Sequence, residues 1–136
     1  MLRLFVIVIF MFGINSCRIF HISGSNTIIT EGQYTILSLK ENGLLKDSCL
    51  ITGYIFDRRI NYPVEHVFIR LNEQKMLSET DSMGYFSIKC NPGIYILKVI
   101  SAGYFTLETS PIDLKPNTVL EMKIDLGSEV QFETNR

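Results

Sequence analysis

From Leu50 onward the chain alternates apolar and polar side chains with a period of two, and turn residues interrupt the alternation at short intervals. This alternation is typical of β-strands that bury one face. It predicts seven strands, at residues 51–57, 67–71, 76–80, 86–90, 95–99, 104–109 and 119–126. We find no amphipathic helix pattern of useful length. The pattern therefore predicts an all-β fold, a seven-stranded antiparallel two-sheet β-sandwich.

Turn residues separate the predicted strands between residues 80 and 104. The Asp81 carboxylate can accept hydrogen bonds from its own downstream backbone, and Gly84 can take a positive φ. Pro92 sets φ for the first corner of the next turn, and Gly93 suits the second corner. The residues that we expect to form the turns and the core around them are Gly53, Asp81, Gly84, Phe86, Pro92, Gly93, Tyr95, Gly103 and Tyr104.

The first 17 residues have the order of a secretory signal. A short basic start containing Arg3 precedes an unbroken apolar run over residues 4–12, which is too short to span a bilayer and suits a signal peptide. The run leads to Ile14-Asn15-Ser16-Cys17, which resembles a bacterial lipobox. We expect a lipoprotein signal peptide at residues 1–16 and acyl chains such as palmitate on Cys17, which anchor the chain to a membrane. The alternative is ordinary cleavage nearby, which leaves Cys17 as a plain thiol.

Removal of residues 1–16 leaves 12 Lys and Arg against 14 Asp and Glu, a formal charge of −2. Arg58-Arg59 is the one basic pair, so the chain lacks the basic patch that nucleic-acid binding needs, and we exclude that function. We expect a tether with a possible extra hairpin at residues 17–49, the sandwich at 50–127 and a tail at 128–136. Residues 34–40 alternate enough to form a strand of that hairpin.

Export bears on the two remaining cysteines. If Cys17 carries lipid, Cys49 and Cys90 form an even pair in a compartment that can be oxidising. Each lies on the apolar side of its predicted strand, so the simpler interpretation is two buried, inert thiols. A disulfide needs Cα atoms within about 7 Å of each other, and the sequence alone does not give the distance between these two. A Cys49–Cys90 disulfide is therefore an open alternative.

Residues 50–126 resemble the carboxypeptidase regulatory-like domain family. The matching segments are Ile51-Thr52-Gly53-Tyr54-Ile55, Pro63-Val64-Glu65-His66-Val67-Phe68-Ile69, Thr80-Asp81, Gly84-Tyr85-Phe86, Pro92-Gly93-Ile94-Tyr95-Ile96-Leu97 and Gly103-Tyr104. The resemblance implies a transthyretin-like (prealbumin-like) sandwich. Family members occur as accessory domains beside peptidases and at the N-termini of TonB-dependent outer-membrane transporters, notably in Bacteroidetes. His66 stands where the family often has Gly.

Residue spacing favours neither a metal site nor catalysis. His21 and His66 lie far apart, and there is no Cys-x-x-Cys. Asp57 and Asp81 could share a Ca²⁺ at one end of the sandwich, but solvated loop carboxylates are the favoured interpretation. No Ser or Cys has a base and an orienting acid at a suggestive spacing. We predict a protein that is not an enzyme and needs no cofactor and no metal.

Three aromatic residues, Tyr54, Phe56 and Phe68, project away from the apolar side of their predicted strands. Such a face can stack on sugar rings. Alternatively residues 34–40 cover it, which is the interpretation that we favour. Three other aromatic residues are expected to pack the turn ends of the core with their hydroxyl groups in solvent: Tyr85, Tyr95 and Tyr104.

We predict a non-enzymatic, lipid-anchored module of the cell envelope that has a structural role or docks onto a protein partner. Carbohydrate binding through the aromatic face is the alternative. The expected location is the outer membrane. Arg18-Ile19-Phe20-His21 lacks the acidic residues of Bacteroidetes surface-export signals, so we expect the module to face the periplasm.

Overall fold

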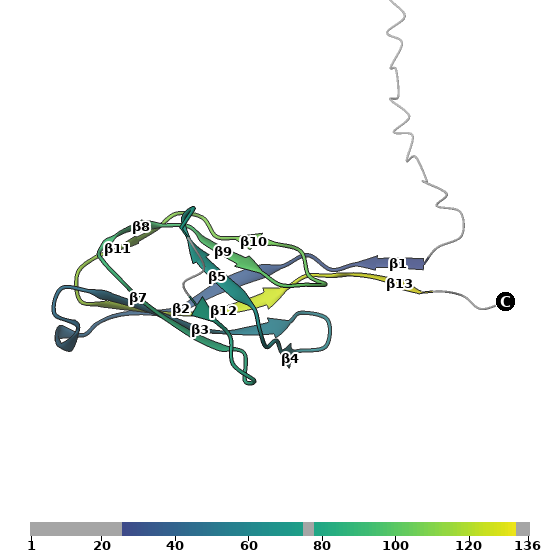
Figure 1. The fold of residues 1–136 in the computed structure, drawn as a ribbon, viewed down its shortest axis with the longest axis horizontal. Coiled ribbons are helices and arrows are strands. Elements are labelled where there is room, and N and C mark those ends of the chain that lie inside the picture. Colours follow the sequence, from purple (N-terminus) through teal and green to yellow (C-terminus); the bar gives the residue numbers. More distant parts are fainter. Residues whose placement is uncertain (1–25, 75–77, 133–136) are drawn as a thin grey trace, which may run out of the picture.

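The computed structural model describes residues 26–74 and 78–132 (Figure 1). The elements are β1 (Asn26–Ile29), β2 (Gln33–Glu41), η1 (Gly43–Leu45), β3 (Cys49–Asp57), β4 (Tyr62–Pro63), β5 (Phe68–Leu71), β6 (Ser78–Glu79), β7 (Tyr85–Cys90), β8 (Gly93–Tyr95), β9 (Leu97–Ile100), β10 (Leu107–Glu108), β11 (Ile112–Leu114), β12 (Thr118–Leu126) and β13 (Glu129–Phe132). The predicted signal peptide and Cys17 lie outside these residues. Within them, no helix is long and apolar enough to cross a membrane.

Two larger sheets dominate the fold (Figure 1). Sheet 1 has the order β2-β12-β3, and β7 and β4 pair along the other edge of β3. Sheet 2 has the order β10-β9-β5-β6. Two short pairs, β1 with β13 and β8 with β11, complete the described strands, and the β1–β13 pair projects from one end of the sheets (Figure 1). The prediction of an all-β fold is confirmed, with sheets packed as in a β-sandwich.

One strand pair of sheet 1 is parallel, so the prediction of an antiparallel sandwich is wrong there. β12 runs parallel to β3 from Val119 opposite Leu50 to Leu126 opposite Asp57. It also pairs antiparallel with β2 and so separates two strands that are consecutive in the chain. The connection between β2 and β3 passes across the start of β12, where Asn117 exchanges backbone hydrogen bonds of 2.7 and 2.9 Å with both ends of that connection.

The strand pairing also moves both expected boundaries of the sandwich, at residues 50 and 127. Residues 34–40 do form a strand, within β2, but β2 joins sheet 1 beside β12 and makes no hairpin with β3. Sheet 1 therefore starts before the predicted boundary at residue 50. At the other end, Glu129–Phe132 is the strand β13, paired with β1, where a tail was expected. Sequence alternation alone does not reveal which distant strand a segment pairs with.

The inward side chains of the two sheets form one core. On β12 the predicted inward residues are almost completely buried, with Leu120, Met122 and Ile124 at 0% exposure. Gly53 of β3 lies opposite Phe86 of β7, whose ring occupies the space that a side chain at position 53 would need. The other buried apolar residues, from both sheets and the strands beside them, are Cys49, Ile51, Ile55, Val67, Ile69, Leu71, Ile88, Leu97, Val99, Leu107, Leu114 and Leu126.

Most of the predicted strands correspond to the larger observed ones, but the structure contains more strands than the seven predicted. β3, β5, β7 and β12 match the predicted positions closely. The predicted strand at 95–99 divides at Ile96 into β8 and β9, which pair with different partners. The predicted strand at 104–109 contracts to β10, and part of the one at 76–80 lies outside the described residues.

Two of the three predicted turns are confirmed. Asp81 Oδ1 accepts hydrogen bonds of 2.9 Å from the amides of Met83 and Tyr85, and Gly84 has a φ of +73°. Gly103 has a φ of +82°. The turn predicted at Pro92-Gly93 is wrong, because Gly93 lies in β8 and pairs with Leu114. After β7 the chain leaves sheet 1, and β8 pairs with β11. β7 and β8 therefore form no hairpin, and the segment between them needs no tight turn.

Candidate functional site

The three aromatic residues proposed as one binding face lie on opposite sides of the sandwich. Tyr54 and Phe56 point outward from β3 in sheet 1, and Phe68 points outward from β5 in sheet 2. Alternation placed each side chain outward correctly, but a period of two does not say on which of two sheets a strand lies. Phe68 is therefore removed from the candidate face.

The favoured interpretation that residues 34–40 cover Tyr54 and Phe56 is also wrong. β2 lies in the plane of sheet 1, with β12 between it and β3, and Tyr54 is 45% exposed. The residue beside Tyr54 is instead Tyr85, its direct partner on β7, with ring centroids 5.2 Å apart. The Phe56 ring, two residues further along β3, has its centroid 6.5 Å from that of Tyr54. Tyr85 does lie at the end of the Asp81–Gly84 turn, as expected, but its ring packs beside Tyr54 on the outer surface and not in the core.

A shallow hollow of about 540 Å³ lies on the outer surface of sheet 1. Ligand pockets commonly measure ~300–1,000 Å³, so the hollow has room for a few side chains or sugar units. We call this surface the outer face of sheet 1. The residues that line the hollow are Leu37, Asn42, Leu50, Thr52, Gly53, Tyr54, Tyr85, Val119, Glu121 and Met122.

Polar groups surround the apolar floor of this hollow. Glu121 of β12 is exposed, and its carboxylate accepts a hydrogen bond of 2.6 Å from the Ser38 hydroxyl. Further along β12, Lys123 forms an ion pair of 3.0 Å with Asp125 and lies 5.2 Å from the centre of the Phe56 ring. The outer face of sheet 1 therefore combines aromatic rings with one carboxylate that is open to solvent.

β2 adds exposed apolar surface at the border of this face. Within the described residues β2 pairs on one side only, with β12. Leu37 (61% exposed) lines the hollow on the outer face. Ile36 (46%) and Leu39 (58%) are exposed at the same edge but on the inner side of the sheet, because their direct partners Met122 and Leu120 point into the core. Leu37 is the extra residue of a β-bulge opposite Glu121 and Met122. Bulges limit uncontrolled edge-to-edge pairing, and edge strands are common sites of protein docking.

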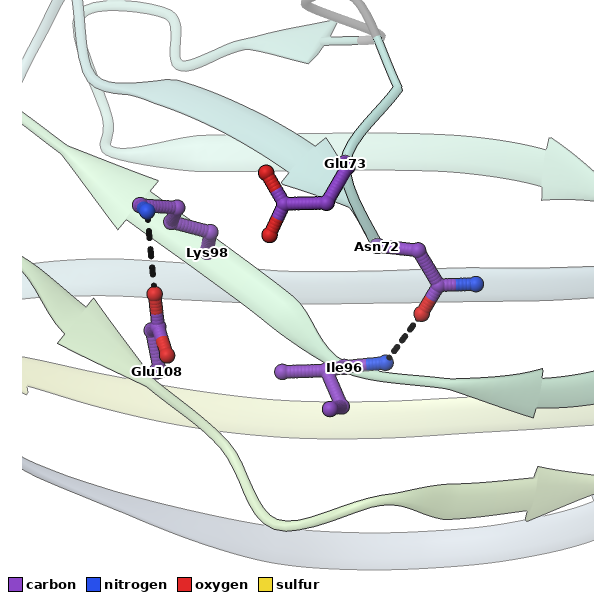
Figure 2. Close-up of a pocket in the computed structure, with 5 residues that line it drawn as sticks. All are labelled: Asn72, Glu73, Ile96, Lys98 and Glu108. Atoms are coloured by element: carbon purple, nitrogen blue, oxygen red, sulfur yellow. Dashed lines mark hydrogen bonds and ion pairs between the residues drawn. The ribbon is translucent and has the colours of Figure 1, made fainter.

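A second hollow lies on the outer surface of sheet 2 (Figure 2). It is too small for several side chains or sugar units, and most of its polar groups are already paired with one another. Its volume is about 140 Å³. Lys98 forms an ion pair of 3.0 Å with Glu108, and the Asn72 side chain accepts a hydrogen bond of 2.9 Å from the Ile96 amide. Glu73 points toward the Lys98 side of the hollow (Figure 2). These pairs explain the local structure without any ligand.

The carboxylates of the two aspartates considered for Ca²⁺ already accept hydrogen bonds from protein groups near them. Asp57 is 5% exposed; its Oδ2 accepts a hydrogen bond of 2.9 Å from the Tyr104 hydroxyl, and its Oδ1 one of 2.8 Å from the Arg59 amide. Tyr104 is thus bonded inward, contrary to the expected solvent contact, and burial followed by this bond raises its pKa. Asp81 holds its own turn. In residues 26–74 and 78–132 no three His, Cys, Asp or Glu side chains are grouped to bind a metal ion.

His66 marks a point of backbone strain at the entry to β5. Its φ is +59°, a conformation that favours glycine. Its ring is hydrogen-bonded to Glu79, which raises its pKa, with a further contribution from the charge of Glu65. The His66 side chain is 73% exposed, so we regard the cluster as a surface ion pair.

The two cysteines occupy directly opposite positions, Cys49 on β3 and Cys90 on β7, and both are free thiols. Tyr95 lies close to them, half-buried, and its hydroxyl donates a hydrogen bond of 2.6 Å to the Asn91 carbonyl. This hydroxyl, too, is bonded to the protein, where solvent was expected.

No family model matches the chain, and a search of the curated proteins also found no match. The outer face of sheet 1 and the N-terminal motif are therefore the features of the chain that point to a function.

Proposed function

We propose that this chain is a non-catalytic module of the cell envelope, held to the outer membrane by acyl chains on Cys17, that docks onto a protein partner through the outer face of sheet 1 and the β2 edge. The observation that carries the proposal is the exposed apolar surface around Leu37 and Tyr54, which line one hollow that reaches the edge strand β2. An exposed edge and exposed apolar side chains are the features that an incoming strand or loop of another protein uses.

The proposal includes membership of the carboxypeptidase regulatory-like family and a transthyretin-like topology. Two observations support it beyond the sequence resemblance. The turns at Gly84 and Gly103 have the positive φ that their glycines suggest. His66, at the position where the family often has glycine, also has a positive φ. A backbone of the same shape with a different residue accounts for this departure from the family pattern.

Site-specific photo-crosslinking in cell membranes tests the docking surface. We expect a crosslinker at Leu37 or Tyr54 to trap one defined protein, because both side chains are exposed in the hollow on the proposed surface. The same crosslinker at Arg70, on the outer surface of sheet 2, is the matched control and should trap none. Equal trapping from both surfaces, or none from Leu37 and Tyr54, would contradict the proposal. Cys17→Ser should release the chain from the membrane fraction.

Carbohydrate binding is a second candidate, and one arrangement favours it. Tyr54 and Tyr85 present rings beside the exposed Glu121 carboxylate in a single hollow, which combines a stacking surface with an acceptor for sugar hydroxyls. If this candidate is correct, oligosaccharides at millimolar concentration shift the amide NMR signals of β3 and β12. Tyr54→Ala should abolish the shifts, and Phe68→Ala, on the other sheet, should leave them unchanged. Unchanged spectra for every oligosaccharide would rule it out.

A further inference from the structure

The ladder between β3 and β7 brings the two buried-side cysteines face to face. Cys49 and Cys90 are direct Cα partners at one end of this antiparallel ladder. At its other end the Ile55 amide donates a hydrogen bond of 2.8 Å to the Gly84 carbonyl. In an antiparallel ladder, hydrogen-bonded and non-hydrogen-bonded residue pairs alternate. Cys49 lies six residues before Ile55, an even number, so Cys49 and Cys90 also form a hydrogen-bonded pair. The Cα atoms of such pairs are ~5.5 Å apart.

That separation is compatible with a covalent bridge. Disulfides commonly join residues whose Cα atoms are ~4.4–6.8 Å apart. Their Cβ atoms are usually ~3.8 Å apart, whereas opposite Cβ atoms in a ladder are ~4.5–5.5 Å apart. The strands must therefore move slightly closer for the bond to form. A bond that needs such an adjustment is easier to reduce than a relaxed structural disulfide.

The two thiols differ in access and in partners. Cys49 is fully buried, and its Sγ donates a hydrogen bond of 3.0 Å to the Lys115 carbonyl. Cys90 is partly exposed and interacts with the Tyr95 hydroxyl. Cys90 is thus the thiol that a soluble oxidant can reach. Cys49 is the buried thiol opposite it, which would attack Cys90 in the second step.

We propose that Cys49 and Cys90 are a reversible redox pair, which a small disulfide oxidant closes into a cross-strand disulfide in the folded protein and which thiols reopen. This inference goes beyond the proposed function, because the reaction needs neither a partner nor a membrane. It replaces the interpretation of two inert thiols.

The chemistry proceeds by two exchanges with oxidised glutathione. The Cys90 thiolate attacks one sulfur of oxidised glutathione, a mixed disulfide forms, and one glutathione thiolate leaves. The Cys49 thiolate then attacks the Cys90 sulfur and displaces the second glutathione thiolate. The protein loses two protons and two electrons, and oxidised glutathione gains them as two glutathione thiols. Burial, and then the neighbouring Cys49, raise the pKa of Cys90, so we expect the first exchange to be slow at neutral pH and faster in mildly alkaline buffer.

Peptide mapping of the full chain in mild detergent tests the proposal. The folded protein is incubated with oxidised glutathione in mildly alkaline buffer, free thiols are alkylated, and the protein is digested with trypsin. Because Lys46 and Lys89 precede the two cysteines closely, trypsin separates them into peptides 47–58 and 90–98. We expect these peptides to be joined, with a mass lower by two hydrogen atoms than the reduced pair. Reduced glutathione should separate them again while the circular dichroism spectrum stays native.

Two variants serve as controls. Cys17→Ser removes the one other cysteine of the chain and should leave the 47–58 to 90–98 link intact, whereas Cys90→Ser should abolish it. The proposal is overturned if both thiols of the folded wild-type protein are alkylated after incubation, or if the oxidant stops at a mixed disulfide on Cys90. It is also overturned if the link forms only in urea, since the pair would then not be aligned by the folded ladder. These outcomes are read from wild-type protein and do not depend on how a variant folds.

Discussion

Gly84→Val is expected to lower the free energy of unfolding by about 3–5 kcal/mol, which is a large part of the stability of a small domain. Two separate costs combine at this position. The backbone has a φ of +73°, which a β-branched residue adopts only with strain. A Cβ at position 84 would also lie 2.4 Å from the Ile55 carbonyl oxygen, a backbone atom that belongs to the neighbouring strand. Urea denaturation followed by circular dichroism measures the loss.

Gly103→Val is the matched control, because it isolates one of the two costs. Gly103 has a similar φ of +82°, but a Cβ there would meet no atom within 4 Å. The expected loss is therefore the conformational strain alone, about 1–2 kcal/mol. If the two variants lose the same stability, the close approach of Gly84 to β3 is wrong. A wild-type melting temperature in Gly84→Val would contradict the turn itself.

Phe86→Ala is expected to have an effect of similar size, a loss of about 3–5 kcal/mol in the free energy of unfolding. Phe86 is the largest side chain among those almost completely buried, at 1% exposure, and its ring fills the space above Gly53. Removal of the ring leaves a cavity between the sheets that the surrounding strands cannot close without breaking their ladders. Thermal or urea unfolding of the purified variant measures this loss.

Two further variants define the Phe86 prediction. Phe105→Ala removes the same side chain at a position that is 42% exposed and should cost much less. Adding Gly53→Ala to Phe86→Ala should not restore stability, because a Cβ at position 53 would also lie 2.4 Å from the Met122 carbonyl oxygen. Similar losses in Phe86→Ala and Phe105→Ala would contradict the placement of Phe86 in the core. Tyr95→Ala should cost less than Phe86→Ala, because Tyr95 is only half-buried.

Local patterns were sufficient for the parts of the fold that depend on one strand or one turn at a time. The inward residues of β12 follow from alternation because a strand buries every second side chain. The turn at Asp81 and Gly84 follows from the chemistry of those two residues, since a carboxylate can bond the local backbone and glycine tolerates positive φ. The turn predicted at Pro92-Gly93 was wrong because the pairing of β8 with distant β11 decided the conformation there.

The candidate site depended more on long-range pairing. Tyr54 and Phe56 could be found as outward aromatics, but Tyr85 joins them only because β7 pairs with β3 in one register. Phe68 looked equivalent in the sequence and lies on the other sheet. Leu37 and Glu121 come from strands far apart in the chain, so no local signal could have linked them to the site.

By itself the sequence determined the strand-rich fold, the faces of the main strands and the turns at Gly84 and Gly103, because these follow from side-chain periodicity and local backbone preference. The tertiary structure alone decided that β12 separates β2 from β3, that β2 leaves Tyr54 uncovered, and that Cys49 faces Cys90. These features depend on which strands pair and in which register. Many pairings satisfy the same alternation, and only the packing of the whole core selects one of them.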